Sequence, residues 1–151
     1  MKKITLAKAL KEKNKLVKKI LGSQHLLNET NSVIKGNNRD FQPAALLNNL
    51  KSDTDKLVRL KSAINKANLP INQLIIRTAE NKSIIAFLKK LDTKAGKSAE
   101  RYSREMPIEY DAAITGRMVL EEIAKLEAEI ERNQEEIDAF NHATEVEVAL
   151  D

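Results

Sequence analysis

The sequence predicts an all-α protein: a four-helix bundle of long, coiled-coil-like helices with a short extended segment between the third and fourth helices. Charged residues make up 32% of the chain and aromatic residues only 3%, with no tryptophan, a composition typical of helix bundles with aliphatic cores. Apolar residues recur at steps of three and four along separate segments, which is the period of one helical face. The 151 residues suffice for one domain, residues 1–151, with a single core.

The first two helices are predicted over residues 4–27 and from Pro43 to about residue 67; residues 28–32 end the first pattern, and residues 33–42 form a polar loop. Pro43 suits the first turn of a helix, where its missing N–H costs no hydrogen bond. The second helix ends at Asn68-Leu69-Pro70, because a residue before proline is disfavoured in the α region. The two predicted stripes are Leu6, Leu10, Val17, Leu21 and Gln24, and then Leu47, Leu50, Leu57, Leu60 and Ile64.

The third helix is predicted to begin after Thr78, a suitable N-cap residue, and to end near Gly96. Its apolar face consists of Ile84, Ile85, Leu88 and Leu91. The fourth helix is predicted from about Gly116 to about Asn141, and it carries an uninterrupted heptad repeat, the pattern of a coiled-coil seam. The seam positions step by four and three and are Val119, Ile123, Leu126, Ile130, Asn133, Ile137 and Phe140.

The segment over residues 100–116 differs from the helices around it. It holds both tyrosines of the chain and Pro107, which disfavours helix. Apolar residues alternate with polar ones around Ile108, which predicts a short, ordered, extended piece. Tyrosine, methionine and arginine are enriched at protein interfaces, so the predicted interface residues are Tyr102, Arg104, Met106 and Tyr110. The alternative is that the segment covers one end of its own bundle.

Two asparagines lie on the apolar stripes, Asn14 in the first helix and Asn133 in the fourth. A polar side chain at such a position costs stability unless it is hydrogen-bonded. In coiled coils a single asparagine of this kind fixes the register or the number of partners. We therefore predict Asn14 and Asn133 as register residues, with satisfaction by water at the edge of a stripe as the alternative.

The charge is divided unequally along the chain. Residues 1–20 contain eight lysines and one glutamate, a net charge of +7, whereas residues 121–151 carry a net charge of −9. One interpretation is that the basic helix binds nucleic acid or an anionic membrane. The other is that the first and last helices are antiparallel neighbours whose charges attract. The scarcity of aromatic residues that stack on bases favours the second interpretation over nucleic-acid binding.

No motif in the sequence points to catalysis, a cofactor or a metal. His25 with Glu29, and His142 with Glu145, have spacings that place two ligands on one helical face, but two ligands are not a site. The acidic residues of the fourth helix lie off its seam, and the glycines are isolated, which does not match a phosphate-binding loop. The chain has no cysteine and no apolar run long enough for a signal peptide or a membrane span, so a cytoplasmic protein is expected.

Four short motifs resemble a family of small bacterial proteins labelled septicolysin-like. They are I-T-L-A-K-A-L near the start, A-I-N-K-A-N at residues 63–68, R-Y-S-R at residues 101–104 and N-H-A-T-E-V at residues 141–146. The resemblance covers nearly the whole chain and implies an all-helical protein without an agreed biochemical role. Its label implies a lytic activity. Members of the family have a threonine-containing turn after the second helix, where this chain has Leu69-Pro70-Ile71.

The function predicted from the sequence is non-enzymatic: a helical bundle that acts through protein–protein association, including homo-oligomer formation. The alternative is a membrane-surface-binding or lytic protein that uses the basic first helix. Nucleic-acid binding is the third and least favoured hypothesis, and no cofactor is expected.

Overall fold

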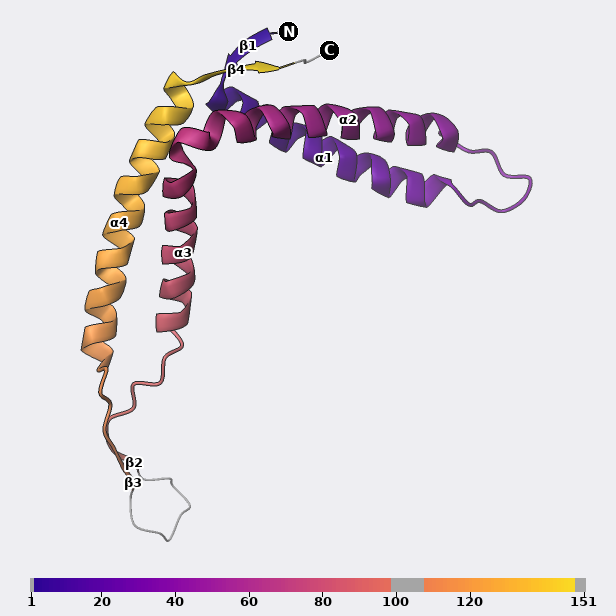
Figure 1. The fold of residues 1–151 in the computed structure, drawn as a ribbon. Coiled ribbons are helices and arrows are strands. Elements are labelled where there is room, and N and C mark those ends of the chain that lie inside the picture. Colours follow the sequence, from indigo (N-terminus) through magenta and orange to yellow (C-terminus); the bar gives the residue numbers. More distant parts are fainter. Residues whose placement is uncertain (1, 99–107, 149–151) are drawn as a thin grey trace. The chain divides into compact units, whose positions relative to one another are not determined.

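The computed structural model describes residues 2–98 and 108–148, and this part of the chain is mostly helical, as the sequence predicts (Figure 1). The four long helices are α1 (Leu6–Thr30), α2 (Pro43–Asn68), α3 (Asn72–Leu88) and α4 (Gly116–Ala143), and the short 3-10 turn η1 (Leu69–Ile71) joins α2 to α3. There are also four short strands in the described residues, of which the sequence predicts only the third: β1 (Lys2–Thr5), β2 (Gly96–Ser98), β3 (Ile108–Tyr110) and β4 (Glu145–Val148).

The chain divides into two compact units. The first unit comprises Met1–Ile71 and Asp138–Asp151, and the second comprises Asn72–Ile137. Each unit is built on a pair of antiparallel helices that follow one another in the sequence, and each has its own cluster of buried apolar residues. The two units are described separately below.

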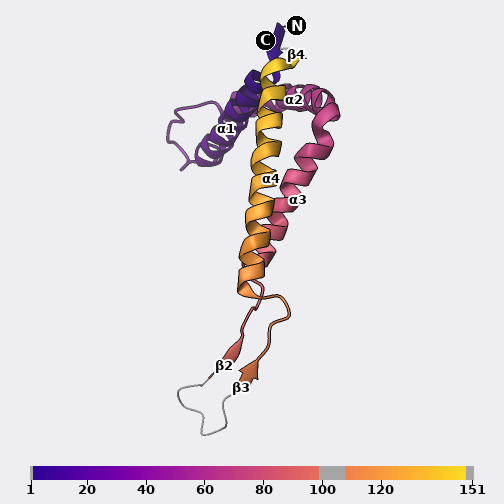
Figure 2. The same ribbon diagram turned by 90° about the vertical axis from the view of Figure 1, so that its left-hand side faces the viewer.

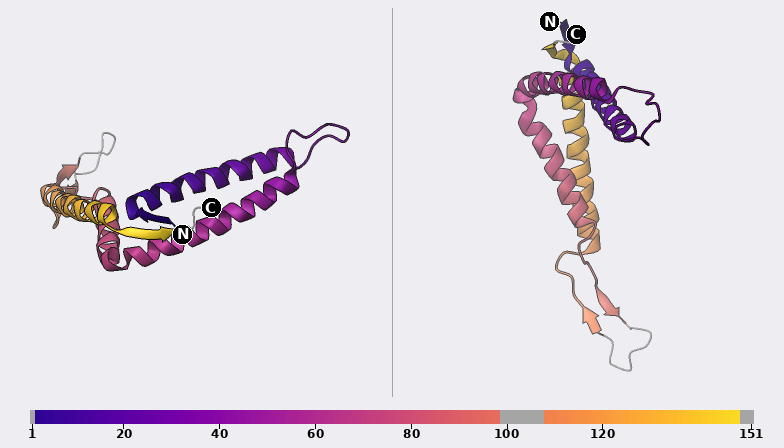
Figure 3. Two further views of the ribbon diagram at one scale, coloured as in Figure 1. Left: turned by 90° about the horizontal axis from the view of Figure 1, so that it is seen from above. Right: turned by 90° about the vertical axis from the view of Figure 1, so that its right-hand side faces the viewer.

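In the first unit, α1 and α2 lie side by side along their length (Figure 3). Each helix turns one stripe toward the other, and the stripe positions step by three and four, which keeps them on one face. The predicted apolar stripe of α2 is largely correct, except that Leu47 is exposed and Leu46 lies on the stripe instead. The predicted apolar stripe of α1 is partly wrong, because Leu21 is 58% exposed. The buried and half-buried stripe positions are Leu6, Ala9, Lys13, Leu16, Ile20, Ser23 and Leu27 in α1, and Leu46, Leu50, Asp53, Leu57, Leu60, Ile64 and Ala67 in α2.

The core of the first unit lies where both ends of the described chain meet. Strand β1 pairs with β4 in an antiparallel ribbon in which Ile4 stands opposite Val146, and the Leu6 N–H donates to the Thr144 carbonyl oxygen at 2.8 Å. Alternate residues of a strand face the same side, so the valines of E-V-E-V point into the core while its glutamates face solvent. The buried cluster consists of Ile4, Leu6, Ala9, Leu60, Ile64, Val146 and Val148.

Thr5 ends β1 and caps α1. Its extended backbone and its side-chain oxygen, which accepts a hydrogen bond from the Lys8 N–H at 3.3 Å, satisfy one of the free donors of the first turn. At the other end of α1, the Arg39 guanidinium donates to the Thr30 and Asn31 carbonyl oxygens, at 3.2 Å each. The loop between α1 and α2 is therefore tied to the helix end by a cation placed where the helix dipole favours one.

In the second unit, α3 and α4 run antiparallel and lie side by side (Figure 2). Every position of the predicted α4 seam is buried or half-buried, and its last residue, Phe140, lies in the first unit and packs against the buried cluster there. Val119 and Ile123 pack with Ile85 of α3 in the buried cluster of this unit. The half-buried residues packed against this cluster are Leu88, Leu91, Leu126 and Ile130.

The predicted bounds of the third helix are wrong at both ends. The helix begins at Asn72, because Pro70 is accommodated in the 3-10 turn and the chain re-enters the α conformation directly after it. Thr78 is therefore inside the helix and 4% exposed, and its hydroxyl donates to the Leu74 carbonyl oxygen at 2.9 Å. The helix ends at Leu88, and Gly96, with a φ of +84°, begins β2 instead. That φ lies in the left-handed region, which glycine adopts without the cost of a Cβ.

The extended segment predicted between the third and fourth helices is found at β3. Its partner was not predicted: β3 pairs antiparallel with β2, so that Gly96 stands opposite Tyr110 and Ser98 opposite Ile108. The result is a two-stranded ribbon beyond the α3–α4 pair, visible in Figure 2. A ribbon of two short strands is marginally stable on its own in water.

The predicted pairing of the first and last helices is wrong, because the buried stripe of α1 faces α2 and that of α4 faces α3. Exposed ion pairs contribute only about 0–1 kcal/mol each, so apolar seams decide which helices pack together. The basic and acidic ends of the chain meet in the β1–β4 ribbon instead. There Lys3 Nζ lies 3.8 Å from Glu147 Oε1, with both side chains exposed.

Candidate functional site

No constellation of catalytic or metal-ligating side chains is found in the part of the chain that the structure describes, where no three His, Asp or Glu residues converge as metal ligands. His25 Nε2 does lie 3.3 Å from Glu29 Oε1, but both side chains are exposed on one face of α1. His142 is exposed in the last turn of α4. The candidate functional regions are therefore the outer faces of the helices and the polar residues within their seams.

Of the predicted interface residues, Tyr102, Arg104 and Met106 lie outside the described residues. Tyr110 lies in β3 and is 39% exposed, and Lys94 Nζ stands 5.6 Å from the centre of its ring, within the range of a cation–π contact. Ile108 is two residues away on the same strand, so its side chain and that of Tyr110 face the same side of the ribbon. This side is an exposed apolar surface on a short ribbon.

The two predicted register residues lie in different units and in different surroundings. Asn14 is exposed on α1, off the stripe that faces α2. Asn133 is half-buried in the seam of α4, and its Nδ2 has no hydrogen-bond partner. Asn81, which was not predicted, occupies the seam of α3; it is 2% exposed, and its Nδ2 also has no partner. Its place at steps of three and four from Thr78 and Ile85 was the sequence signal that would have identified it.

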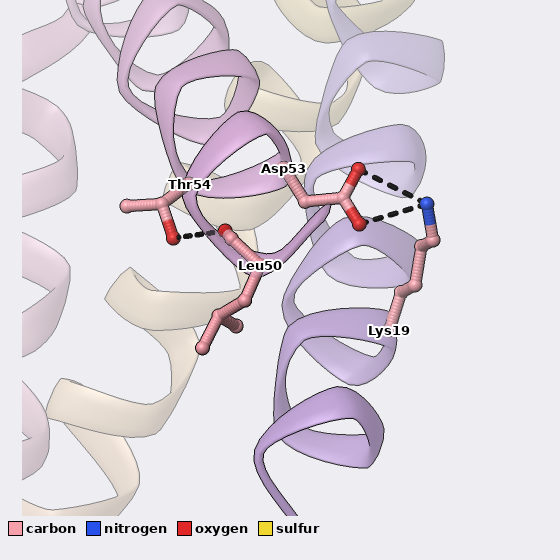
Figure 4. A network of polar contacts seen from close by, with 4 residues as sticks. All are labelled: Lys19, Leu50, Asp53 and Thr54. Atoms are coloured by element: carbon pink, nitrogen blue, oxygen red, sulfur yellow. Dashed lines mark hydrogen bonds and ion pairs between the residues drawn. The ribbon is translucent and has the colours of Figure 1, made fainter. Parts of the chain in front are cut away.

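Asp53 is a second seam residue that sequence reasoning missed. It follows Leu50 by three and precedes Leu57 by four, which places its carboxylate on the buried stripe of α2, where it is 4% exposed. Lys19 of α1 reaches it, with Nζ 3.0 Å from Oδ1 as a hydrogen bond and 2.8 Å from Oδ2 as an ion pair (Figure 4). A buried carboxylate requires such a partner, because its desolvation would otherwise be uncompensated. The ion pair of Lys19 and Asp53 therefore links α1 to α2 at one fixed position along the two helices.

α3 has a second apolar face on the side opposite its seam. The seam of α3 consists of Leu74, Thr78, Asn81, Ile85 and Leu88, so residues half a turn away point to solvent. Three large apolar side chains of α3 lie there, Ile76, Ile84 and Phe87, and they are between 44% and 62% exposed. We call this surface the α3 outer face; it comprises Ile76, Glu80, Ser83, Ile84 and Phe87.

α1 carries a different outer face. Four exposed lysines step by three, four and three along its solvent side, away from α2, and we call them the lysine row: Lys8, Lys11, Lys15 and Lys18. A shallow groove runs beside the row and is lined by Ala7, Leu10, Lys11, Asn14, Lys15 and Lys18. Asn14 therefore belongs to a basic, partly apolar surface rather than to a helix–helix seam.

A larger groove lies at the loop end of the first unit, between the C-terminal turns of α1 and the N-terminal turns of α2. Leu27 and Leu47 line it together with Arg39. Because the Arg39 guanidinium already caps the carbonyl oxygens at the end of α1, its charge serves the loop connection. This groove adds no group with a chemical role beyond that cap.

Comparisons with known proteins give a fold and no activity. No protein-family model matches the chain, and no curated protein matches it. The chain is similar to a solved structure described as the crystal structure of a functionally unknown conserved protein from Corynebacterium diphtheriae, with 21% identity and a TM-score of 0.79. The similarity covers 97% of this chain and 100% of that one. At this identity the similarity shows the fold alone.

Replacing Lys19 with methionine should lower the free energy of unfolding by about 1–3 kcal/mol, because the Asp53 carboxylate would remain buried without its partner. The control is Lys15→Met on the same helix, whose Nζ contacts only Glu12 of α1, at 2.9 Å, and whose loss should cost no more than about 0.5 kcal/mol. Asp53→Leu continues the apolar seam and should be neutral or stabilising. Urea denaturation of the three variants measures these differences, and equal stability of the two lysine variants would contradict the assignment.

Replacing Asn81 or Asn133 with leucine should raise the melting temperature, because each substitution removes a buried donor that has no partner. It should also loosen the register of the helices or the number of chains in the assembly, since an apolar seam accepts more than one alignment. Thermal denaturation and light scattering measure the two effects. Asn65→Leu, at an exposed position of α2, is the control. A lower melting temperature with an unchanged assembly would refute the register role.

Proposed function

We propose that this protein acts without catalysis, as a helical protein that associates with other proteins and with copies of itself. The observation that carries the proposal is the α3 outer face. α3 has apolar residues on two opposite sides, and large apolar side chains left exposed on a helix often mark a binding surface. Within its own unit α3 has one helical partner, α4, which leaves the second face for another protein surface.

The energetics favour covering this face. Removing apolar surface from water stabilises a complex by roughly 25 cal/mol per Å², before the cost of association is subtracted. Soluble proteins rarely leave a contiguous stripe of large apolar side chains in water unless it serves binding. On the α3 outer face Ile84 and Phe87, one helical step apart, are 44% and 62% exposed and Ile76 is 53% exposed, so this face is the first candidate for an interface.

The test is the mass of the purified protein in solution across a range of concentrations. We expect a mass at least twice the 17.0 kDa of one chain, measured by sedimentation or light scattering. Because apolar contacts hold the assembly, it should persist at about 1 M salt, where charge–charge contacts between exposed groups are screened within about 3 Å. A single-chain mass at every concentration would exclude self-association as part of the function.

A second candidate function is binding to an anionic membrane surface, the activity that the septicolysin-like resemblance also suggests. The lysine row favours it, because four exposed lysines lie in line on the solvent side of α1 beside a half-buried apolar strip that includes Leu10 and Val17. A basic helix with an adjoining apolar strip binds at the boundary of headgroups and acyl chains. Within the described residues, no helix combines the length and apolar content that crossing a bilayer requires. Any membrane activity of these helices would therefore begin at the surface.

Co-sedimentation with vesicles tests the second candidate. Binding to vesicles rich in phosphatidylserine, and not to pure phosphatidylcholine, should be lost when the lysine row is changed to glutamine, because each lysine near such a surface contributes about 1 kcal/mol. A control variant with Lys51, Lys61, Lys82 and Lys89 changed to glutamine carries the same net charge and should keep binding. Equal loss in both variants would show that total charge, and not the row, is responsible. Release of a trapped dye would distinguish lysis from binding.

A further inference from the structure

The groove beside the lysine row brings three ammonium groups to one place. Its polar lining consists of Lys11, Asn14, Lys15 and Lys18, which are positions i, i+3, i+4 and i+7 of one helix. Side chains three and four residues apart are neighbours on a helix surface, so these four surround a single spot on α1. Lys8, the remaining member of the row, does not line the groove. The groove is therefore a smaller and more specific feature than the row.

The charge of the groove matches that of a doubly charged anion. Glu12 lies beside it, with Oε1 at 2.9 Å from the Nζ of Lys15. In the described part of the chain, no ion pair involves Lys11 or Lys18, so their ammonium groups can bind another anion. Three ammonium groups and one carboxylate leave the groove a net charge of +2. A phosphate monoester carries a charge of about −1.5 to −2 at pH 7, closer to this value than a phosphate diester or a carboxylate.

The hydrogen-bond donors of the groove also suit a phosphate monoester. A lysine ammonium group has only donors, and the side-chain amide of Asn14 places a further donor group among the three lysines. Hydrogen bonds from a charged donor to a phosphate oxygen are stronger than those between neutral groups. A monoester presents three terminal oxygens on one phosphorus atom, whereas a diester presents only two. It can therefore accept from more of these donors at once.

One wall of the groove is apolar. Ala7 and Leu10 line it, and Leu10 begins a strip that continues along α1 with Val17 and Leu21, of which Leu21 is 58% exposed. A soluble phosphate ester gains little from such a strip. A membrane lipid, by contrast, holds its phosphate directly above its acyl chains, where the apolar side of a surface-bound helix lies. The groove and the strip together therefore match a phosphate that is part of a lipid surface.

We infer that the groove lined by Lys11, Asn14, Lys15 and Lys18 binds the phosphate monoester headgroup of a membrane lipid, of the chemical class of phosphatidic acid. The inference rests on the second candidate function, binding to an anionic membrane surface, and names the lipid and the residues that select it. Phosphatidylserine suits the groove less well, because its phosphate is a diester and its own ammonium group would face the lysines.

Co-sedimentation with two kinds of vesicle tests the preference. Phosphatidylcholine vesicles carry either phosphatidic acid or phosphatidylserine, in amounts that give the same surface potential, so that only the headgroup chemistry differs. The dissociation constant for the phosphatidic acid vesicles should be lower by about 10-fold or more, because additional charge-assisted hydrogen bonds form only there. Equal binding to both vesicles would overturn the inference and leave the second candidate function standing. Binding to neither would refute both.

Substitutions in the groove test which residues select the lipid. Asn14→Ala keeps every charge and removes one donor group, so it should reduce the preference for phosphatidic acid by about threefold to tenfold and leave binding to phosphatidylserine unchanged. Lys18→Gln should reduce the preference as well. The matched control is Lys8→Gln, which removes the same charge from the row outside the groove and should weaken binding to both vesicles equally.

All three positions are exposed, so the variants should stay folded, as circular dichroism will show. A preference for phosphatidic acid that survives both Asn14→Ala and Lys18→Gln would overturn the inference. So would a loss of the preference in Lys8→Gln that equals the loss in Lys18→Gln, because the row as a whole would then be responsible.

Glycerol 3-phosphate distinguishes a lipid headgroup from a free phosphate ester. It carries the same phosphate monoester without acyl chains, so it should displace the protein from phosphatidic acid vesicles only when it is in large excess over the lipid. Displacement at equal concentrations of the two phosphates would show that the groove takes soluble phosphate esters, and it would overturn the assignment to a lipid.

Discussion

Each helix of this protein packs along one other helix of its unit, and most other features of the structure follow from that constraint. A helix in an antiparallel pair can bury one stripe, and the rest of its surface faces water unless another element covers it. The buried clusters are correspondingly small: one contains Leu6, Leu60 and Ile64 with the residues of the ribbon, and the other is centred on Ile85, Val119 and Ile123. Cores of this size give limited stability. Contacts at the helix ends and polar residues in the seams therefore make up a larger share of the stability than they would in a larger domain.

The β1–β4 ribbon enlarges the small core of the first unit. Ile4, Val146 and Val148 add three buried side chains to the end of the α1–α2 pair, and Leu6 becomes fully inaccessible to solvent as a result. The Leu6 N–H, a free donor in the first turn of α1, is satisfied by the Thr144 carbonyl oxygen. One short strand pair thus closes the core, satisfies a helix end and brings the first and last strands of the described chain together.

The sequence predicted well what depends on local pattern and poorly what depends on a distant partner. The seam of α4 could be predicted because all seven of its positions keep the heptad and only Asn133 is polar. The seam of α1 could not, because Lys13 and Ser23 interrupt it while Leu10, Val17 and Leu21 form a more apolar stripe beside it. The choice between those stripes is made by α2 and by β4, and neither contact is visible in the sequence of α1.

The same reasoning explains the errors elsewhere. β4 is four residues long and pairs with a strand from the other end of the chain, so only the alternation in E-V-E-V signalled it. An apolar repeat does not reveal Asp53 or Asn81, because both are polar. A seam between two helices can include such polar positions, and only the structure shows which of them have a hydrogen-bond partner. The α3 outer face was hidden by its own composition, since Ile84 and Ile85 adjoin in sequence and only the structure shows that Ile85 is buried and Ile84 is not.

The outer faces of the helices differ in charge, and the α3 outer face differs from those of α1 and α4. The lysine row lies on the outer side of α1, and the acidic residues of α4 lie off its seam. These charged faces are hydrated, and each repels a face of the same charge. On the α3 outer face, by contrast, the stripe from Ile76 to Phe87 includes a single charged residue, Glu80. Charged outer faces of this kind disfavour tight association between like surfaces, whereas exposed apolar side chains favour it. The polar side chains of these faces limit aggregation, and Glu80 within the apolar stripe would require a hydrogen-bond donor in any surface that buries it.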